Sequence, residues 1–279
     1  MFLLFKKFTA VSSILVLLSI TNSCKQNNTS KTGDLPVTMD DSSRVIIDRA
    51  IAYAGGYDAW QQKKTLSFDK KSISYDTAGS GKIMRETNMH LDYMMKPEFR
   101  AKLTYKLHDT TIMLIHDGQK ARKFYNGKMS AEQKDIDGAW NSCYGSQYVM
   151  CMPFKLKDPG IKADYVGQVT MKDGSPAQVI KTSYMKGAGS NPNHIWYYYF
   201  EPGTGKLLAN SLSSKNNYWD FTRYEQFEKE NGLLLPGVRI GYSADTLNKP
   251  GIMVSESKHS NVVFDKEFPA DHFKIAYGN

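Results

Sequence analysis

The chain has 279 residues, with 36 Lys and Arg against 28 Asp and Glu, and a net charge of +8. Lysines are spread along the whole chain and blocks of like charge are absent, so nothing indicates a nucleic-acid groove. The six His and three Cys show no His-x-His, His-Glu-x-x-His or Cys-x-x-Cys spacing, so we expect neither a metal nor a cofactor.

Residues 1–23 have the organisation of a secretory signal peptide. Lys6 and Lys7 supply the positive region, a short apolar run follows, and a small residue precedes Cys24. The apolar run is too short for a spanning helix, which needs about 20 residues. The position of the cysteine resembles a bacterial lipoprotein signal, in which Cys24 becomes the lipidated N-terminus and holds the protein on a membrane. An ordinary signal peptide followed by a stray cysteine is the alternative.

The next segment, residues 24–40, is small and polar, and this composition predicts a flexible tether. The folded domain is therefore expected over residues 41–279. Its first element is an amphipathic helix that residues 42–43 cap at the N-terminus and the glycines at 55–56 end. One more helical turn is expected around Trp60.

From Thr65 onward the apolar residues recur with a period of two, which predicts an antiparallel series of strands. Asp-Gly and Asn-Gly pairs supply several of the turns between them. A sheet of this length must close or pack against another layer, because open edges promote aggregation. The expected strands are 65–75, 83–95, 99–105, 111–116, 119–125, 164–171, 177–184, 194–200, 207–213, 218–227, 234–243, 253–261 and 262–264.

The strand pattern breaks at residues 130–160, where we expect a short helical segment over one face of the sheet. Asp135 and Asp137, near its start, are interpreted as a solvated face. The apolar residues that follow are candidate ligand contacts, since Met-rich and aromatic surfaces accept flexible chains. A closed core that these residues simply fill is the alternative. The same two interpretations apply to Trp60 and Trp196, for which we favour a core position. The candidates are Trp140, Tyr144, Tyr148, Met150, Met152 and Phe154.

Two cysteines remain after Cys24, at positions 143 and 151. Eight residues of helix span about 12 Å, whereas the Cα atoms of a disulfide lie within about 7 Å. Cys143 and Cys151 can therefore pair only if the chain bends between them. We favour two buried thiols.

The order of these features resembles the LolA/LolB-like envelope proteins, in particular their uncharacterised lipoprotein branch. The resemblance implies a mainly β fold, a half-open antiparallel β-barrel whose mouth is covered by the N-terminal helix and the inserted helical segment. It also implies a hydrophobic cavity for acyl chains. The matching segments are the helix ending at Gly55-Gly56 with Trp60, and those at residues 156–160, 198–207, 231–236 and 268–273.

Taken together, these features predict a lipoprotein of the cell envelope, anchored in the outer membrane and facing the periplasm. The expected activity is non-enzymatic binding of a lipid or acyl chain, with a role in lipid or lipoprotein trafficking. A structural lipoprotein with a filled barrel and protein partners is the alternative. A third hypothesis, a hydrolase, would require a histidine clustered with a serine and an acid in the folded chain.

Overall fold

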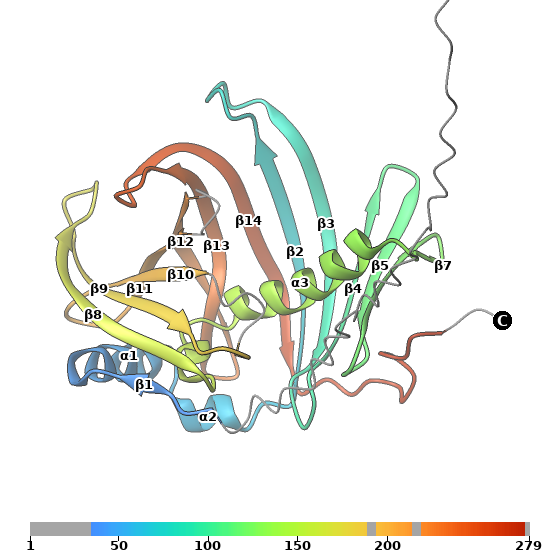
Figure 1. The fold of residues 1–279 in the computed structure, drawn as a ribbon, viewed down its shortest axis with the longest axis horizontal. Coiled ribbons are helices and arrows are strands. Elements are labelled where there is room, and N and C mark those ends of the chain that lie inside the picture. Colours follow the sequence, from blue (N-terminus) through green and yellow to red (C-terminus); the bar gives the residue numbers. More distant parts are fainter. Residues whose placement is uncertain (1–34, 189–193, 214–218, 277–279) are drawn as a thin grey trace, which may run out of the picture. The chain divides into compact units, whose positions relative to one another are not determined.

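The computed structural model describes residues 35–188, 194–213 and 219–276. Their main feature is a curved sheet of 14 strands in the order β1-β8-β9-β10-β11-β12-β13-β14-β2-β3-β4-β5-β6-β7 (Figure 1). Every pairing is antiparallel except that of β1 with β8. Within these residues the end strands β1 and β7 do not pair with each other. The predicted mainly β, half-open barrel is therefore confirmed.

The bounds of the elements follow the predicted strands closely, although the last two expected strands form the single strand β14. The strands are β1 (Thr38–Met39), β2 (Thr65–Tyr75), β3 (Ile83–Met94), β4 (Arg100–Leu107), β5 (Thr110–His116), β6 (Ala121–Tyr125), β7 (Lys128–Met129), β8 (Ile161–Thr170), β9 (Pro176–Tyr184), β10 (Ile195–Phe200), β11 (Leu207–Ser213), β12 (Trp219–Glu230), β13 (Leu233–Ala244) and β14 (Pro250–Phe264). The helices are α1 (Asp41–Tyr53), α2 (Tyr57–Gln61), α3 (Gln133–Met150) and the 3₁₀ segment η2 (Phe154–Lys157).

The core lies on the inner face of the sheet, beneath α3. Phe68, Leu91, Leu103 and Leu114 are cross-strand partners from β2 to β5 and are at most 4% exposed. Alternation places every second residue of these strands on this face, which is why the period-two pattern located them. Each such side chain contributes about 1.5–3 kcal/mol through burial.

The folded domain begins a few residues earlier than predicted. Thr38–Met39 pairs with β8, although the sequence assigned these residues to a tether ending at position 40. Asp40, rather than Ser42 or Ser43, is the N-cap of α1, and its carboxylate accepts from the backbone N–H of Ser43 at 2.7 Å. Hydrogen bonding to Ser43 and Tyr165 lowers the pKa of Asp40. Residues 24–34 of the expected tether, with Cys24, and the signal peptide lie outside the described residues.

The predicted helix end at Gly55 and Gly56 is confirmed, and the structure gives a reason for both glycines. Each has a positive φ, of 110° and 94° respectively. A Cβ on Gly55 would overlap the carbonyl oxygen of Gly232 in the β12–β13 turn, whereas a Cβ on Gly56 would meet nothing within 4 Å. The backbone N–H of Leu234 donates to Ala54 at 2.9 Å, so the end of α1 is fixed against β13.

The inserted segment is longer and more regular than expected. Instead of a short helical stretch, α3 runs for 18 residues across the inner face of the sheet and contacts β4, β5, β6 and β13 (Figure 1). Pro153 lies just beyond its C-terminus, where a proline cannot continue a helix. The η2 turn then carries Phe154 into the core, where its ring stacks on Trp60 with centroids 4.9 Å apart.

Cys143 and Cys151 are free, fully buried thiols, as favoured from their spacing. Burial raises the pKa of each to about 12, so neither forms the reactive thiolate at neutral pH. We expect both to resist iodoacetamide in the native protein and to react fully after denaturation, as measured by intact mass. Rapid alkylation of the folded protein would show that the segment around these cysteines opens.

Candidate functional site

The N-terminal end of α3 is fixed to the sheet through Asp135. Its carboxylate accepts hydrogen bonds from Ser130 Oγ at 2.6 Å, Lys123 Nζ at 3.0 Å and Tyr125 OH at 3.0 Å. These bonds, with Ser130 contributing most, lower the pKa of Asp135 to about 2. The interpretation of Asp135 as part of a solvated face is therefore wrong, because its partners come from β6 and the loop before the helix. Asp137 is exposed, as expected.

The structure divides the six candidate ligand contacts into two groups. Met150, Met152 and Phe154, at the C-terminal end of the insertion, are at most 1% exposed and belong to the main core. Trp140, Tyr144 and Tyr148 lie along α3 and are only half-buried. The first group can contact a ligand only if α3 moves, whereas the second already presents surface.

Trp140 and Tyr144 form an aromatic cluster around His116. Their ring centroids lie 4.9 and 5.1 Å from the imidazole, and Phe99 stacks on Tyr144 at 4.2 Å. His116 Nδ1 accepts from the backbone N–H of Gly118 at 3.1 Å, while Nε2 is buried with no hydrogen-bond partner among the described residues. Burial lowers the pKa of His116, so the ring beneath α3 is neutral.

Tyr148 belongs to a second aromatic cluster, which the strands supply. Its hydroxyl lies 2.9 Å from that of Tyr198, and its ring lies 5.9 Å from Trp196 and 6.2 Å from Tyr184. Trp60 is core, but Trp196 is half-buried and packs beside the helix. Tyr184 and Tyr198 were not among the predicted ligand contacts. The alternation within Ile195–Phe200 could have placed Tyr198 on the same face as Trp196.

Among the described residues, two of the surface hollows lie away from these aromatic clusters. One, of about 870 Å³, lies beside α2 and is lined by Gln61, Gln62, Lys64, Lys96 and Pro97. The other, of about 320 Å³, lies between α1 and the β8–β9 edge. Both are open to solvent rather than enclosed, so neither would bury an acyl chain as a binding cavity does.

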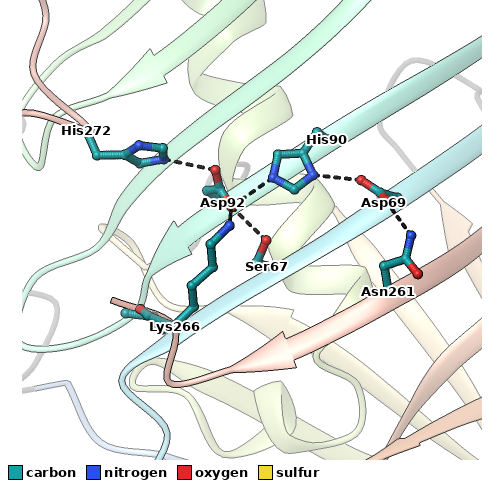
Figure 2. A network of polar contacts seen from close by, with 8 residues as sticks. Ser67, Asp69, His90, Asp92, Asn261, Lys266 and His272 are labelled. Atoms are coloured by element: carbon teal, nitrogen blue, oxygen red, sulfur yellow. Dashed lines mark hydrogen bonds and ion pairs between the residues drawn. The ribbon is translucent and has the colours of Figure 1, made fainter. Parts of the chain in front are cut away.

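The outer face of β2 and β3 carries a polar network centred on Asp92, which Figure 2 shows. Its carboxylate accepts from Ser67 Oγ at 2.7 Å and contacts His272 Nε2 at 2.9 Å and His90 Nε2 at 3.1 Å (Figure 2). His90 Nδ1 lies 2.7 Å from Asp69. Although burial opposes it, these partners lower the pKa of Asp92.

This network brings a serine, an acid and two histidines together, which is the condition set for a hydrolase. However, the contacts are not arranged as a nucleophilic serine requires. A nucleophilic serine must donate to an imidazole that an acid orients, whereas Ser67 donates to Asp92 and the carboxylate separates it from both rings. His272 and Lys266 come from the segment after β14, so the network fastens that segment onto the outer face.

In the described residues, no three His, Cys, Asp or Glu side chains are grouped as metal ligands. No helix in this part of the chain has the length and apolar character needed to cross a bilayer.

Comparison with solved structures identifies the fold. A DUF1329 family protein from Desulfovibrio piger has a TM-score of 0.53 at 11% identity, covering 84% of this chain and 98% of its own. A LolA superfamily protein from Nitrosomonas europaea has a TM-score of 0.53 at 9% identity, covering 84% and 97%. The predicted LolA/LolB-like fold is thus confirmed, although identities this low establish the fold alone.

In comparisons of sequence, no curated protein matches the chain. One family model does match, that of a family of unknown function, DUF6503, and it covers residues 36–235, which is more than half of the chain. The chain therefore belongs to the DUF6503 family.

Proposed function

We propose that this protein is a lipid-anchored lipoprotein of the bacterial cell envelope that binds a lipid or acyl chain on the inner face of its sheet. The observation that carries the proposal is the half-buried aromatic surface along α3 on a LolA-like scaffold. Trp140 lies there beside His116, and Tyr148 lies beside Trp196 of β10. Binding would be driven by burial of hydrocarbon, at about 25 cal/mol per Å², without covalent chemistry.

The anchor and location in this proposal rest on the sequence. Cys24 follows a signal peptide and would carry the acyl chains, holding the domain at the outer membrane on its periplasmic side. The finer role we propose is transfer of lipids or lipoproteins between envelope compartments. Intact mass of the protein from its native host tests the anchor, because Cys24→Ser should remove the mass of the lipid.

The binding test is native mass spectrometry of the domain purified without detergent. We expect adducts of lipid mass, or uptake of an added fatty acid, and a clear loss of uptake in Tyr148→Ala and Trp196→Ala. Tyr53→Ala is the matched control, since Tyr53 lies on α1 and is 39% exposed. A ligand-free mass with no uptake would contradict the proposal.

A second function, that of a structural lipoprotein with protein partners, is favoured by one observation. Met150, Met152 and Phe154 are almost fully buried in the core at the end of α3 and present no open apolar surface there. Crosslinking in cells would then capture defined protein partners, and purified protein would take up no lipid.

A further inference from the structure

Two basic side chains lie on the inner face of the sheet, on neighbouring parts of β2 and β13. Lys70 follows Phe68 by two residues, so it shares the face on which that core ring lies. Arg239 pairs across β14 through Ser257 with Ser72, which in turn follows Lys70 by two. Lys70 and Arg239 therefore lie on the same inner face, close enough for Arg239 to act electrostatically on Lys70, and both are half-buried.

In the described part of the chain, the two cations lack carboxylate partners in contact, although the Tyr224 hydroxyl lies within hydrogen-bonding reach of Arg239. Within the residues described, neither forms an ion pair, and the Nε atom of Arg239 is buried without a hydrogen-bond partner. Asp220, on β12, acts electrostatically on Arg239, but its Oδ1 atom is equally unpartnered. Unpaired charge removed from water is costly, so the arrangement favours an added anion.

The titration of the surrounding groups agrees with an excess of positive charge. Burial and the charge of Arg239 lower the pKa of Lys70 to about 8. Burial, with the charges of Arg239 and Lys70, lowers the pKa of His259 to about 3. Burial raises the pKa of Asp220 to about 6, which weakens its value as a counter-ion. An anion bound here would reverse the effect on both bases.

The residues between and beside the cations suit an amphiphile. Ser257 and Ser72 are small hydroxyl side chains in the same cross-strand row as Arg239. On the other side of Lys70, the cross-strand row continues with Met89 and Tyr105, which are half-buried and pack against the core. On this face of the sheet, a polar surface therefore lies directly beside an apolar one.

We propose that Lys70 and Arg239 bind the anionic head group, a carboxylate or a phosphate, of an acyl ligand whose hydrocarbon lies over Met89 and Tyr105. The proposal rests on the proposed lipid-binding function and names the chemistry that function would select. The head group would take the bidentate donors of Arg239 and the charge of Lys70.

The test compares three ligands that share an oleoyl or oleyl chain. Oleate carries a carboxylate, oleoyl lysophosphatidate a phosphate, and oleyl alcohol no charge. Calorimetry below the micelle concentration should show either or both of the anions binding at least about tenfold more tightly than the alcohol, the change typical of a charge-assisted hydrogen bond. Which anion binds distinguishes the two sources. The preference should weaken as salt is added.

Variants test whether Lys70 and Arg239 cause the preference for the anionic ligands over the alcohol. Lys70→Gln and Arg239→Gln should each abolish most of it while leaving alcohol binding intact, and Arg239→Lys, which keeps the charge, should restore part of it. Lys71→Gln is the matched control, because Lys71 is the next residue, is exposed and pairs with Glu86 at 2.9 Å. Thermal melting of each variant confirms folding.

The outcomes separate the two proposals. If none of the three ligands binds, the proposed function fails. If all three bind equally, or if the anion preference survives in both Lys70→Gln and Arg239→Gln, lipid binding stands and the head-group site is overturned.

Discussion

Between pH 7 and pH 4.5, the free energy of unfolding of the wild type is expected to fall by about 3 kcal/mol more than that of His259→Asn. The imidazole is 1% exposed, its Nδ1 lies 2.7 Å from the carbonyl oxygen of Pro236, and its ring packs edge-on against Phe68. Burial and two nearby cations lower its pKa to about 3. A neutral histidine of this kind loses its stabilisation as the pH falls below the unfolded pKa of 6.5 toward the folded value.

The measurement is the free energy of unfolding by denaturant at both pH values, for wild type and variant. Asn can still donate to Pro236 but cannot take up a proton. Asp220 acts in the opposite direction, because its raised pKa makes acidification favour the folded state, yet it is present in both proteins and cancels in the comparison. His108→Asn, at an exposed turn position, is the control and should follow the wild type. Equal pH profiles for wild type and His259→Asn would contradict the prediction.

The second large effect is expected at Gly55. Substitution by Ala imposes a positive φ on a residue with a Cβ, at about 1–2 kcal/mol, and adds an overlap with the Gly232 carbonyl that costs about 1–3 kcal/mol more. We therefore expect a loss of roughly 2–5 kcal/mol in the free energy of unfolding. The loss should arise at the contact between α1 and the β12–β13 turn.

Gly56→Ala is the matched control for this substitution. It imposes comparable backbone strain, but a Cβ there meets nothing within 4 Å. Denaturant midpoints of the two variants should differ, with Gly55→Ala the less stable. Equal midpoints would mean that backbone strain alone accounts for both losses and that the β12–β13 turn yields easily.

The sequence predicted the strands well because each one buries a single face, and burial of one face leaves a period-two pattern. Helix α1 was predicted for the same local reasons, an apolar stripe and two glycines at its end. The start of α3 was not predicted, because Asp135 contacts Lys123 and Tyr125 on another element. A local sequence pattern does not indicate such distant partners.

The two cations on the inner face were not predicted as site residues, for a related reason. Lys70 stands beside Lys71 in a polar stretch that resembles a solvated strand. Alternation from Leu66 and Phe68 places Lys70 alone on the buried face, so the signal was present but weak. Arg239, from a distant strand, meets it only through the sheet order, which pairs β14 with both β13 and β2.

The two-residue strand at the start of the domain also has a practical consequence. Thr38–Met39 covers the backbone of β8, and Asp40 both caps α1 and accepts from the N–H of Tyr165 at 2.6 Å. In a recombinant fragment beginning at Asp41, that edge of β8 would be unpaired, and an unpaired strand edge is a template for self-association. Such a fragment should precipitate or form oligomers, whereas one beginning at Leu35 should stay monodisperse in gel filtration.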